Sequence, residues 1–212
     1  MKKNALLLIT VLCTAASLNA AGANKFFARP FAMFLEYTDE YFESEDGYGI
    51  AAGMFLDSNH SHELSVEFSS THWEFSQPFM RFNNATLNTT GNGDATPVQA
   101  NYRYYPFAST ARFRPYIGAS AGFAKLSGDI ERILSGPWYE GKIDDWNFSF
   151  GASAGVSVRI TDNFSAELGY RYLQINGSDV QTYHHGSGHL GVVIPFEDLK
   201  AHILTAAITI HF

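Results

Sequence analysis

Residues 183–199, YHHGSGHLGVVIPFEDL, include a histidine, a serine and a glutamate, residue types that some hydrolases use for catalysis. His185 supplies a base, Ser187 a nucleophile and Glu197 an acid, which together are the parts of a hydrolytic triad. The surrounding glycines predict a loop, and a triad works only when its members are held in a fixed mutual geometry. The three residues are therefore a candidate catalytic site whose geometry the fold has to supply.

Two clusters have the residue types of metal ligands. His184, His185 and His189 carry imidazoles, but adjacent histidines point in different directions and no fixed ligand spacing is present. The acidic stretch from Asp39 to Asp46 offers the hard oxygen ligands that a divalent cation prefers. Its spacing matches no defined ion-binding loop, so a solvated acidic tip explains it better. We expect no metal and no cofactor.

The elements that position these residues are indicated by a period of two. In WNFSFGASAGVSVRI, residues 146–160, an apolar or aromatic side chain occupies every second position, and mostly Gly and Ser fill the gaps. This alternation indicates a β-strand. A water-soluble barrel would need long charged side chains on its solvent face, whereas small polar ones suit a crowded interior. The pattern therefore predicts that the apolar face points into lipid.

The same alternation recurs in eight runs. They are Pro30–Thr38, Tyr48–Leu56, His62–His72, Pro97–Tyr105, a run from Pro115, residues 146–160, Phe164–Tyr172 and His202–Phe212. Connections after the second, fourth and sixth runs are short, and those after the third, fifth and seventh are long and polar. We expect an all-β fold, a closed antiparallel up-and-down transmembrane barrel of eight strands with short periplasmic turns and long extracellular loops.

The first residues predict secretion. Lys2 and Lys3 precede an apolar run at 5–17, and small residues follow at Ala20 and Ala21, which is the pattern of a secretory signal peptide. We expect residues 1–21 to be a cleaved signal peptide and residues 22–212 to form one barrel domain. The single cysteine, Cys13, lies in the signal, so the mature chain has no disulfide.

Composition narrows the function classes. Cleavage of the predicted signal peptide removes two lysines and leaves 12 basic and 21 acidic residues, a net charge of −9. This acidic balance argues against nucleic-acid binding. Charged residues make up 17% of the chain and aromatic residues 15%. The charged share is below the roughly 25% of soluble domains, so less surface faces water.

Strand parity predicts a charged interior. The residues assigned to it are Glu36, Glu67, Arg103, Arg159, Glu167 and Arg171. Eight strands leave an interior just wide enough for side chains, and unpaired charges there are costly. An ion-paired plug is the favoured interpretation, and a polar path for small solutes is the alternative. We expect Arg159 to be the partner of Glu167.

Several segments resemble a known family. RPYIGASAGFAKL from Arg114, FGASAGVSVRITDNFSAELGYRY from Phe150 and the terminal ITIHF are similar to the small outer-membrane β-barrels of Gram-negative bacteria, the Opa-, OmpA-, OmpX- and OmpW-type proteins. Ile208, Ile210 and Phe212 resemble the signal read by the barrel-assembly machinery. The resemblance implies an outer-membrane location among lipid and lipopolysaccharide, but no single activity.

Three function classes remain. The favoured one is a structural or surface-interaction barrel that binds an extracellular ligand through its outer loops, in particular the aromatic-rich loop at 73–95. A narrow passive pore is the second. The third is a lipid A-modifying hydrolase, because the His-x-Ser followed by Glu resembles deacylase barrels of the PagL type, although Gly188 stands where those enzymes have Asn. We expect that the protein is not an enzyme.

Overall fold

Eight long strands form the wall of the molecule in the computed structural model, which describes residues 25–82, 85–134, 138–184, 190–196 and 198–212. The wall strands are β1 (Phe26–Tyr37), β2 (Glu45–Phe55), β3 (His62–Phe82), β4 (Ala85–Tyr104), β5 (Phe113–Leu134), β6 (Trp138–Arg159), β7 (Phe164–Ile175) and β10 (Leu199–His211). Each pairs antiparallel with its neighbours, and pairing of β1 with β10 completes the ring. The predicted closed eight-stranded up-and-down barrel is confirmed.

Two further strands lie outside the ring. β8 (Ser178–His184) and β9 (Leu190–Phe196) form an antiparallel hairpin, and β8 pairs with β6 at residues 139–141. The sequence predicted a loop for this segment, because its glycines and histidines break the alternation. No helix in the described part of the chain is long and apolar enough to cross a membrane. The predicted signal peptide falls outside the described residues.

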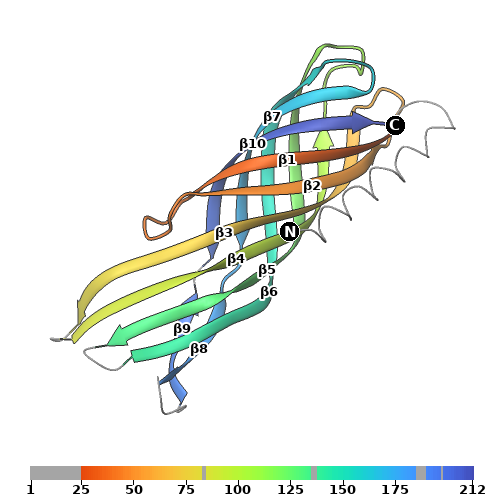
Figure 1. Ribbon diagram of the computed structural model, residues 1–212. Helices are drawn as coiled ribbons and strands as arrows, with labels where there is room; N and C mark the ends of the chain where they lie inside the picture. Colours follow the sequence, from red (N-terminus) through yellow and green to blue (C-terminus); the bar gives the residue numbers. More distant parts are fainter. Residues whose placement is uncertain (1–24, 83–84, 135–137, 185–189, 197) are drawn as a thin grey trace, which may run out of the picture.

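The two ends of the barrel differ in the length of their connections (Figure 1). At one end, residues 56–61, 105–112 and 160–163 make short turns. At the other end, the β3–β4 and β5–β6 hairpins continue side by side well beyond the other wall strands. These four strands are 20 to 22 residues long, about twice the 9 to 11 residues that cross a bilayer. Most of the segment 73–95, which was predicted to be a loop, is therefore strand. The sequence does not indicate this, because strands outside lipid can pair through backbone hydrogen bonds without an alternation of apolar side chains.

The outward face of the wall is an apolar band. Val66, Ile117 and Leu168 are each at least 60% exposed, which is unfavourable in water and favourable in lipid. The outer edge of the band is marked by polar or charged outward-facing side chains on successive strands, Asp46, His72, Asp94, Lys125, Asp144 and His202. Asp94 is the register partner of His72, and Asp144 pairs with Lys125 at 2.9 Å. This edge separates the lipid-facing wall from the outer hairpins.

The assignment of Glu36 to the interior is wrong. In the outer half of β1 the buried positions are Phe31, Met33 and Leu35, whereas Glu36 is exposed opposite His202 of β10. Strand parity was read with the apolar face outward, as it is in β6. In the outer half of β1 the inward residues are apolar instead, because the outer half of the barrel interior is an apolar core.

Arginine at Ala154 tests which face of β6 meets lipid. Ala154 is exposed between Ile117 and Tyr170, whereas Ser153 lies on the inward face with the buried Ser149 and Ser157. We expect Ala154→Arg to destabilise the lipid-inserted barrel by about 2 to 4 kcal/mol, measured by denaturant unfolding in vesicles, with Ala154→Leu as the control. A harmless Ala154→Arg beside a severe Ser153→Arg would invert the assignment.

Candidate functional site

Arg29 is the centre of a buried charge cluster inside the barrel. Its terminal nitrogens donate two hydrogen bonds to Glu63, at 2.9 and 2.7 Å. Its Nε lies 3.0 Å from Glu167 and 2.9 Å from the hydroxyl of Thr209. Arg29 and both glutamates are buried. A two-pronged guanidinium–carboxylate contact of this kind fixes direction as well as charge, so β1, β3, β7 and β10 are held in one mutual arrangement.

Arg103 completes the cluster from β4. It donates to Glu167 at 2.9 Å and lies 3.8 Å from Glu63, so two guanidiniums and two carboxylates alternate. Tyr105 donates its hydroxyl to Glu63 at 2.8 Å, and Thr209 donates to Glu167 at 2.6 Å. Each carboxylate is therefore bound by both arginines and by a hydroxyl. This satisfies most of the hydrogen-bonding capacity that burial would otherwise leave unpaired.

A second buried pair lies one layer toward the outer hairpins. Arg171 donates to the two carboxylate oxygens of Glu67 at 2.5 and 2.7 Å. Gln99 accepts a further bond from Arg171 at 3.3 Å and donates to Ser149 at 3.2 Å. The pair and its amide neighbour extend the polar layer across β3, β4, β6 and β7.

Apolar residues close the interior on both sides of these charges. Toward the turns, Phe27, Phe55, Tyr105 and Tyr116 form a small aromatic cluster. A Cβ at Gly155 or Gly169 would collide with Tyr116, so these two glycines make room for its ring.

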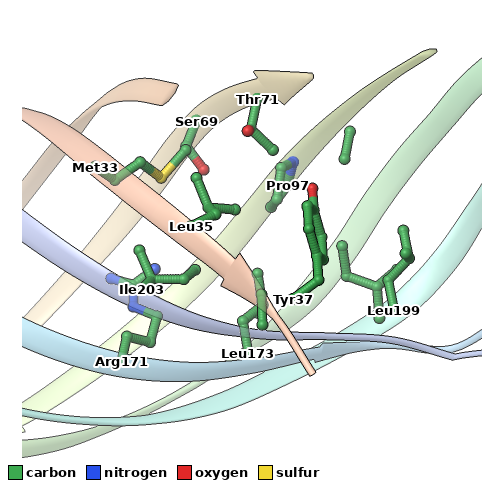
Figure 2. Close-up of a pocket in the computed structure, with 13 residues that line it drawn as sticks. Met33, Leu35, Tyr37, Ser69, Thr71, Pro97, Arg171, Leu173, Leu199 and Ile203 are labelled. Carbon is green, nitrogen blue, oxygen red and sulfur yellow. The ribbon is translucent and has the colours of Figure 1, made fainter. Parts of the chain in front are cut away.

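Toward the outer hairpins lies a larger apolar core. It includes Leu35, Trp73, Ile130, Ile143 and Leu173, all buried. Figure 2 shows side chains of β1, β7 and β10 around a cavity of about 20 Å³ in this core, with Arg171 beside it. Such a volume holds roughly one water molecule. From end to end the described interior is an aromatic cluster, a charged layer and an apolar core.

Four predicted interior residues lie in this charged layer. They are Glu67, Arg103, Glu167 and Arg171. Arg159 does not join them. It is half-buried at the turn end, paired with Asp162 and donating to the carbonyl of Ser109 at 3.2 Å. The predicted partnership with Glu167 is wrong because Arg159 is in register with Ser165, and its side chain reaches the turns instead.

Arg29 and Glu63 were missed. Arg29 has the same strand parity as Phe31. The rule that the apolar set of alternating positions faces lipid therefore assigns Arg29 to the outward face. Glu63 shares its parity with Ser65 and Glu67, and this signal was available from the sequence. Glu63 was not assigned to the interior because it lies next to the turn at residues 56–61.

The triad candidates His185, Ser187 and Glu197 lie outside the described residues, so the hydrolase geometry stays a prediction. Among the residues that are described, no cluster of His, Cys, Asp and Glu is arranged to hold a metal ion. The predicted assembly signal lies on β10 and just after it. Ile208 is exposed on the outward face, and the backbone N–H of Phe212 donates to the carbonyl of Phe26 at 2.8 Å.

The outer hairpins have one apolar face and one charged face. Trp73, Leu126 and Ile130 are buried against the barrel core. On the opposite face, exposed acids recur along the strands, namely Glu74, Asp94, Asp129, Glu131, Glu140 and Asp144. Lys125 and Lys142 are the basic neighbours of Asp144 and Asp129. The hairpins therefore present an ordered and mainly acidic surface.

The chain matches the family model described as outer membrane protein beta-barrel domain over residues 5–212. The outer membrane protein PagN of Salmonella typhimurium is 30% identical over 39% of this chain and 35% of the relative. An uncharacterized protein of Brucella abortus is 33% identical over 32% of this chain and 26% of the relative. The matched part thus spans about a quarter to a third of these relatives.

Solved barrels share the fold. A major outer membrane protein from Thermus thermophilus superposes with a TM-score of 0.59 at 10% identity, covering 88% of this chain and 99% of that one. Neisserial surface protein A gives a TM-score of 0.50 at 16% identity, covering 91% and 100%. At these identities the likeness extends to the fold alone.

A pair of double-mutant cycles tests the charged layer. We expect Glu67→Gln alone to lower the unfolding free energy by about 3 to 5 kcal/mol, because Arg171 is left buried without its counter-charge. The double change with Arg171→Met should recover part of that loss, measured by denaturant unfolding in detergent. The control cycle, Glu167→Gln with Arg159→Met, should be additive, because these side chains do not touch. Coupling in the control and none in the test would refute the pairing.

Proposed function

Because the chain belongs to the outer membrane protein beta-barrel domain family, we propose that it is a structural or surface-interaction protein that contacts an extracellular ligand through its outer hairpins. Its location is the cell outer membrane, in keeping with the family match and with outer-membrane relatives. One observation carries the proposal. A filled interior is combined with hairpins that extend far beyond the wall needed to cross the bilayer.

The filled interior supports this function over a passive pore. Solutes crossing the barrel would have to displace the Arg29–Glu63 and Arg103–Glu167 contacts, and then the apolar core around Trp73. Breaking a buried ion pair from one side is costly, and an apolar core offers a hydrated ion nothing in return. The charged layer therefore fits a plug that fixes strand arrangement.

The hairpins support contact with a partner. Their ladder hydrogen bonds and the buried Trp73 and Ile130 keep them ordered, so binding would lose little conformational freedom. Their exposed face carries more acids than bases, among them Glu131 and Glu140. A surface of that kind fits a partner with basic groups, since complementary charge steers encounter and sets specificity. Catalysis by Ser187 has no part in the proposal.

Planar-bilayer recording tests the sealed interior. We expect the refolded protein to insert without stepwise conductance, because the charged layer and the apolar core occupy the lumen. The matched variant Trp73→Ala should insert equally and remain closed, since the charged layer persists. Discrete conductance steps from the unmodified protein would favour the pore instead.

Hairpin shortening tests the surface role. Ser76 and Thr90 are register partners, and so are Glu131 and Glu140, so residues 77–89 and 132–139 can each be replaced by an Asn-Gly turn. These two segments carry no acid, so the shortened barrel also takes Glu74→Gln, Glu131→Gln and Glu140→Gln, which neutralise exposed acids near the new turns. We expect this shortened and neutralised barrel to refold and keep its heat-modified mobility on gels, and to lose at least about tenfold in affinity for a polylysine surface.

Two controls accompany this experiment. Shortening the β8–β9 hairpin changes the same end without removing the long strands, and binding should persist. A lipid A mass assay with Ser187→Ala separates the hydrolase class. Loss of lipid A cleavage in that variant, with surface binding unaffected by hairpin shortening, would overturn the proposed function.

A further inference from the structure

A polar pocket of about 170 Å³ lies at the turn end of the barrel, away from the outer hairpins. It is lined from three directions, by Ser109 and Thr110 of the β4–β5 turn, by Arg114 at the start of β5 and by Arg159 at the end of β6. Ser165 at the start of β7 adds a third hydroxyl. Short turns of such barrels face the periplasm, so the pocket opens to that compartment.

Arg114 brings a positive charge to this pocket, and no carboxylate of the described residues contacts it at ion-pair distance. The described buried charges comprise four arginines and three glutamates. Arg29, Arg103 and Arg171 are paired with these glutamates. Arg114 is 7% exposed and forms no ion pair with any described residue. A buried charge without a counter-charge is costly, so the site favours an anion.

The contacts of Arg114 leave part of its donor capacity unused. One terminal nitrogen donates to the carbonyl of His60 at 2.5 Å, and the guanidinium lies 4.5 Å above the ring of Tyr105. Its Nε–H is buried and has no hydrogen-bond partner among the described residues. These contacts hold the guanidinium in place while leaving a donor for a further acceptor.

The other lining groups are mainly donors. Arg159 is anchored by the carbonyl of Ser109 and by Asp162 of the β6–β7 turn. Burial, together with the nearby charge of Arg114, lowers the pKa of His60, so this histidine is neutral at neutral pH. The positive charge of the pocket therefore comes from the two arginines, and Asp162, at an exposed turn, offsets part of it.

We propose that this pocket binds a small oxyanion of the phosphate or carboxylate type from the periplasmic side. A planar guanidinium with a free donor matches the geometry of such groups, and charge-assisted hydrogen bonds to them are the strongest available. The hydroxyls of Ser109 and Thr110 are further donors on residues that line the same space. The Ser165 hydroxyl lies 3.1 Å from Nε2 of His211, which also lines the pocket. The site is at the opposite end of the barrel from the outer hairpins and does not depend on the surface role.

Calorimetric titration of the refolded full chain with inorganic phosphate, in an uncharged maltoside detergent at low salt, tests the site. We expect saturable binding that weakens by at least about tenfold in Arg114→Gln, because a charge-assisted contact is lost. Arg112→Gln is the matched control. Arg112 is two residues away, exposed and not part of the pocket lining, so its loss should leave binding unchanged. Acetate, titrated separately, compares carboxylate with phosphate.

Thr110→Glu provides a second variant at an exposed position, where folding is not at risk. It should abolish phosphate binding and raise the unfolding midpoint in phosphate-free buffer, because its carboxylate balances Arg114. Nanodiscs with and without phosphatidic acid distinguish two sources of the bound anion, a lipid head group and free phosphate. Loss of phosphate binding in the anionic discs indicates a lipid head group, and unchanged binding indicates the free ion. Absence of saturable binding, or equal weakening by Arg112→Gln and Arg114→Gln, would overturn the proposal.

Discussion

Closure of the sheet is the constraint on which the other features depend. A strand in lipid has no water to satisfy its backbone N–H and C=O groups, so every edge must be paired. Here β1 pairs with β10 over most of its length, and the last backbone bond joins Phe26 to Phe212. Closure with eight strands makes the lumen narrow. Inward side chains from opposite walls must then pack against one another, and any charge among them must find a partner.

The interior meets this requirement in layers. Arg29 and Arg103 share Glu63 and Glu167, and Arg171 holds Glu67, so the middle of the barrel is neutral as a whole. Aromatic rings close the turn end, and an apolar core closes the outer end. The layering explains why inward residues are Gly and Ser along β6 but Phe31, Met33 and Leu35 along β1. Strand parity shows which residues share a face. Whether the inward face is polar or apolar depends on the layer of the barrel interior at that height.

Past the outer edge of the apolar band the physical demands change. Water can satisfy exposed backbone groups, so strands there need neither closure nor an apolar outward face. β3 to β6 continue as hairpins, because Trp73, Leu126 and Ile143 still bury an apolar inner face. Their outward face is free to carry charge. Anchoring and surface contact are thus built into the same continuous strands.

The barrel could be predicted from the period of two in residues 146–160, from the eight alternating runs and from the short turns. Each of these is a local spacing in the sequence, and exposure to lipid and closure of the sheet allow little deviation from it. Glu67, Arg103, Glu167 and Arg171 could be assigned to the interior for the same reason. The ion-pair partners of these residues could not be predicted, because they depend on which strands lie close together after the barrel closes and on the stagger between the strands. Arg159 was predicted to meet Glu167 and meets Asp162, and Arg29 of β1 reaches past β2 to Glu63 of β3. The length of β3 to β6 was also undetermined, since strands outside lipid lose the alternation that marks them in sequence. Only the tertiary structure brings Arg114 into a pocket made by three separate turns.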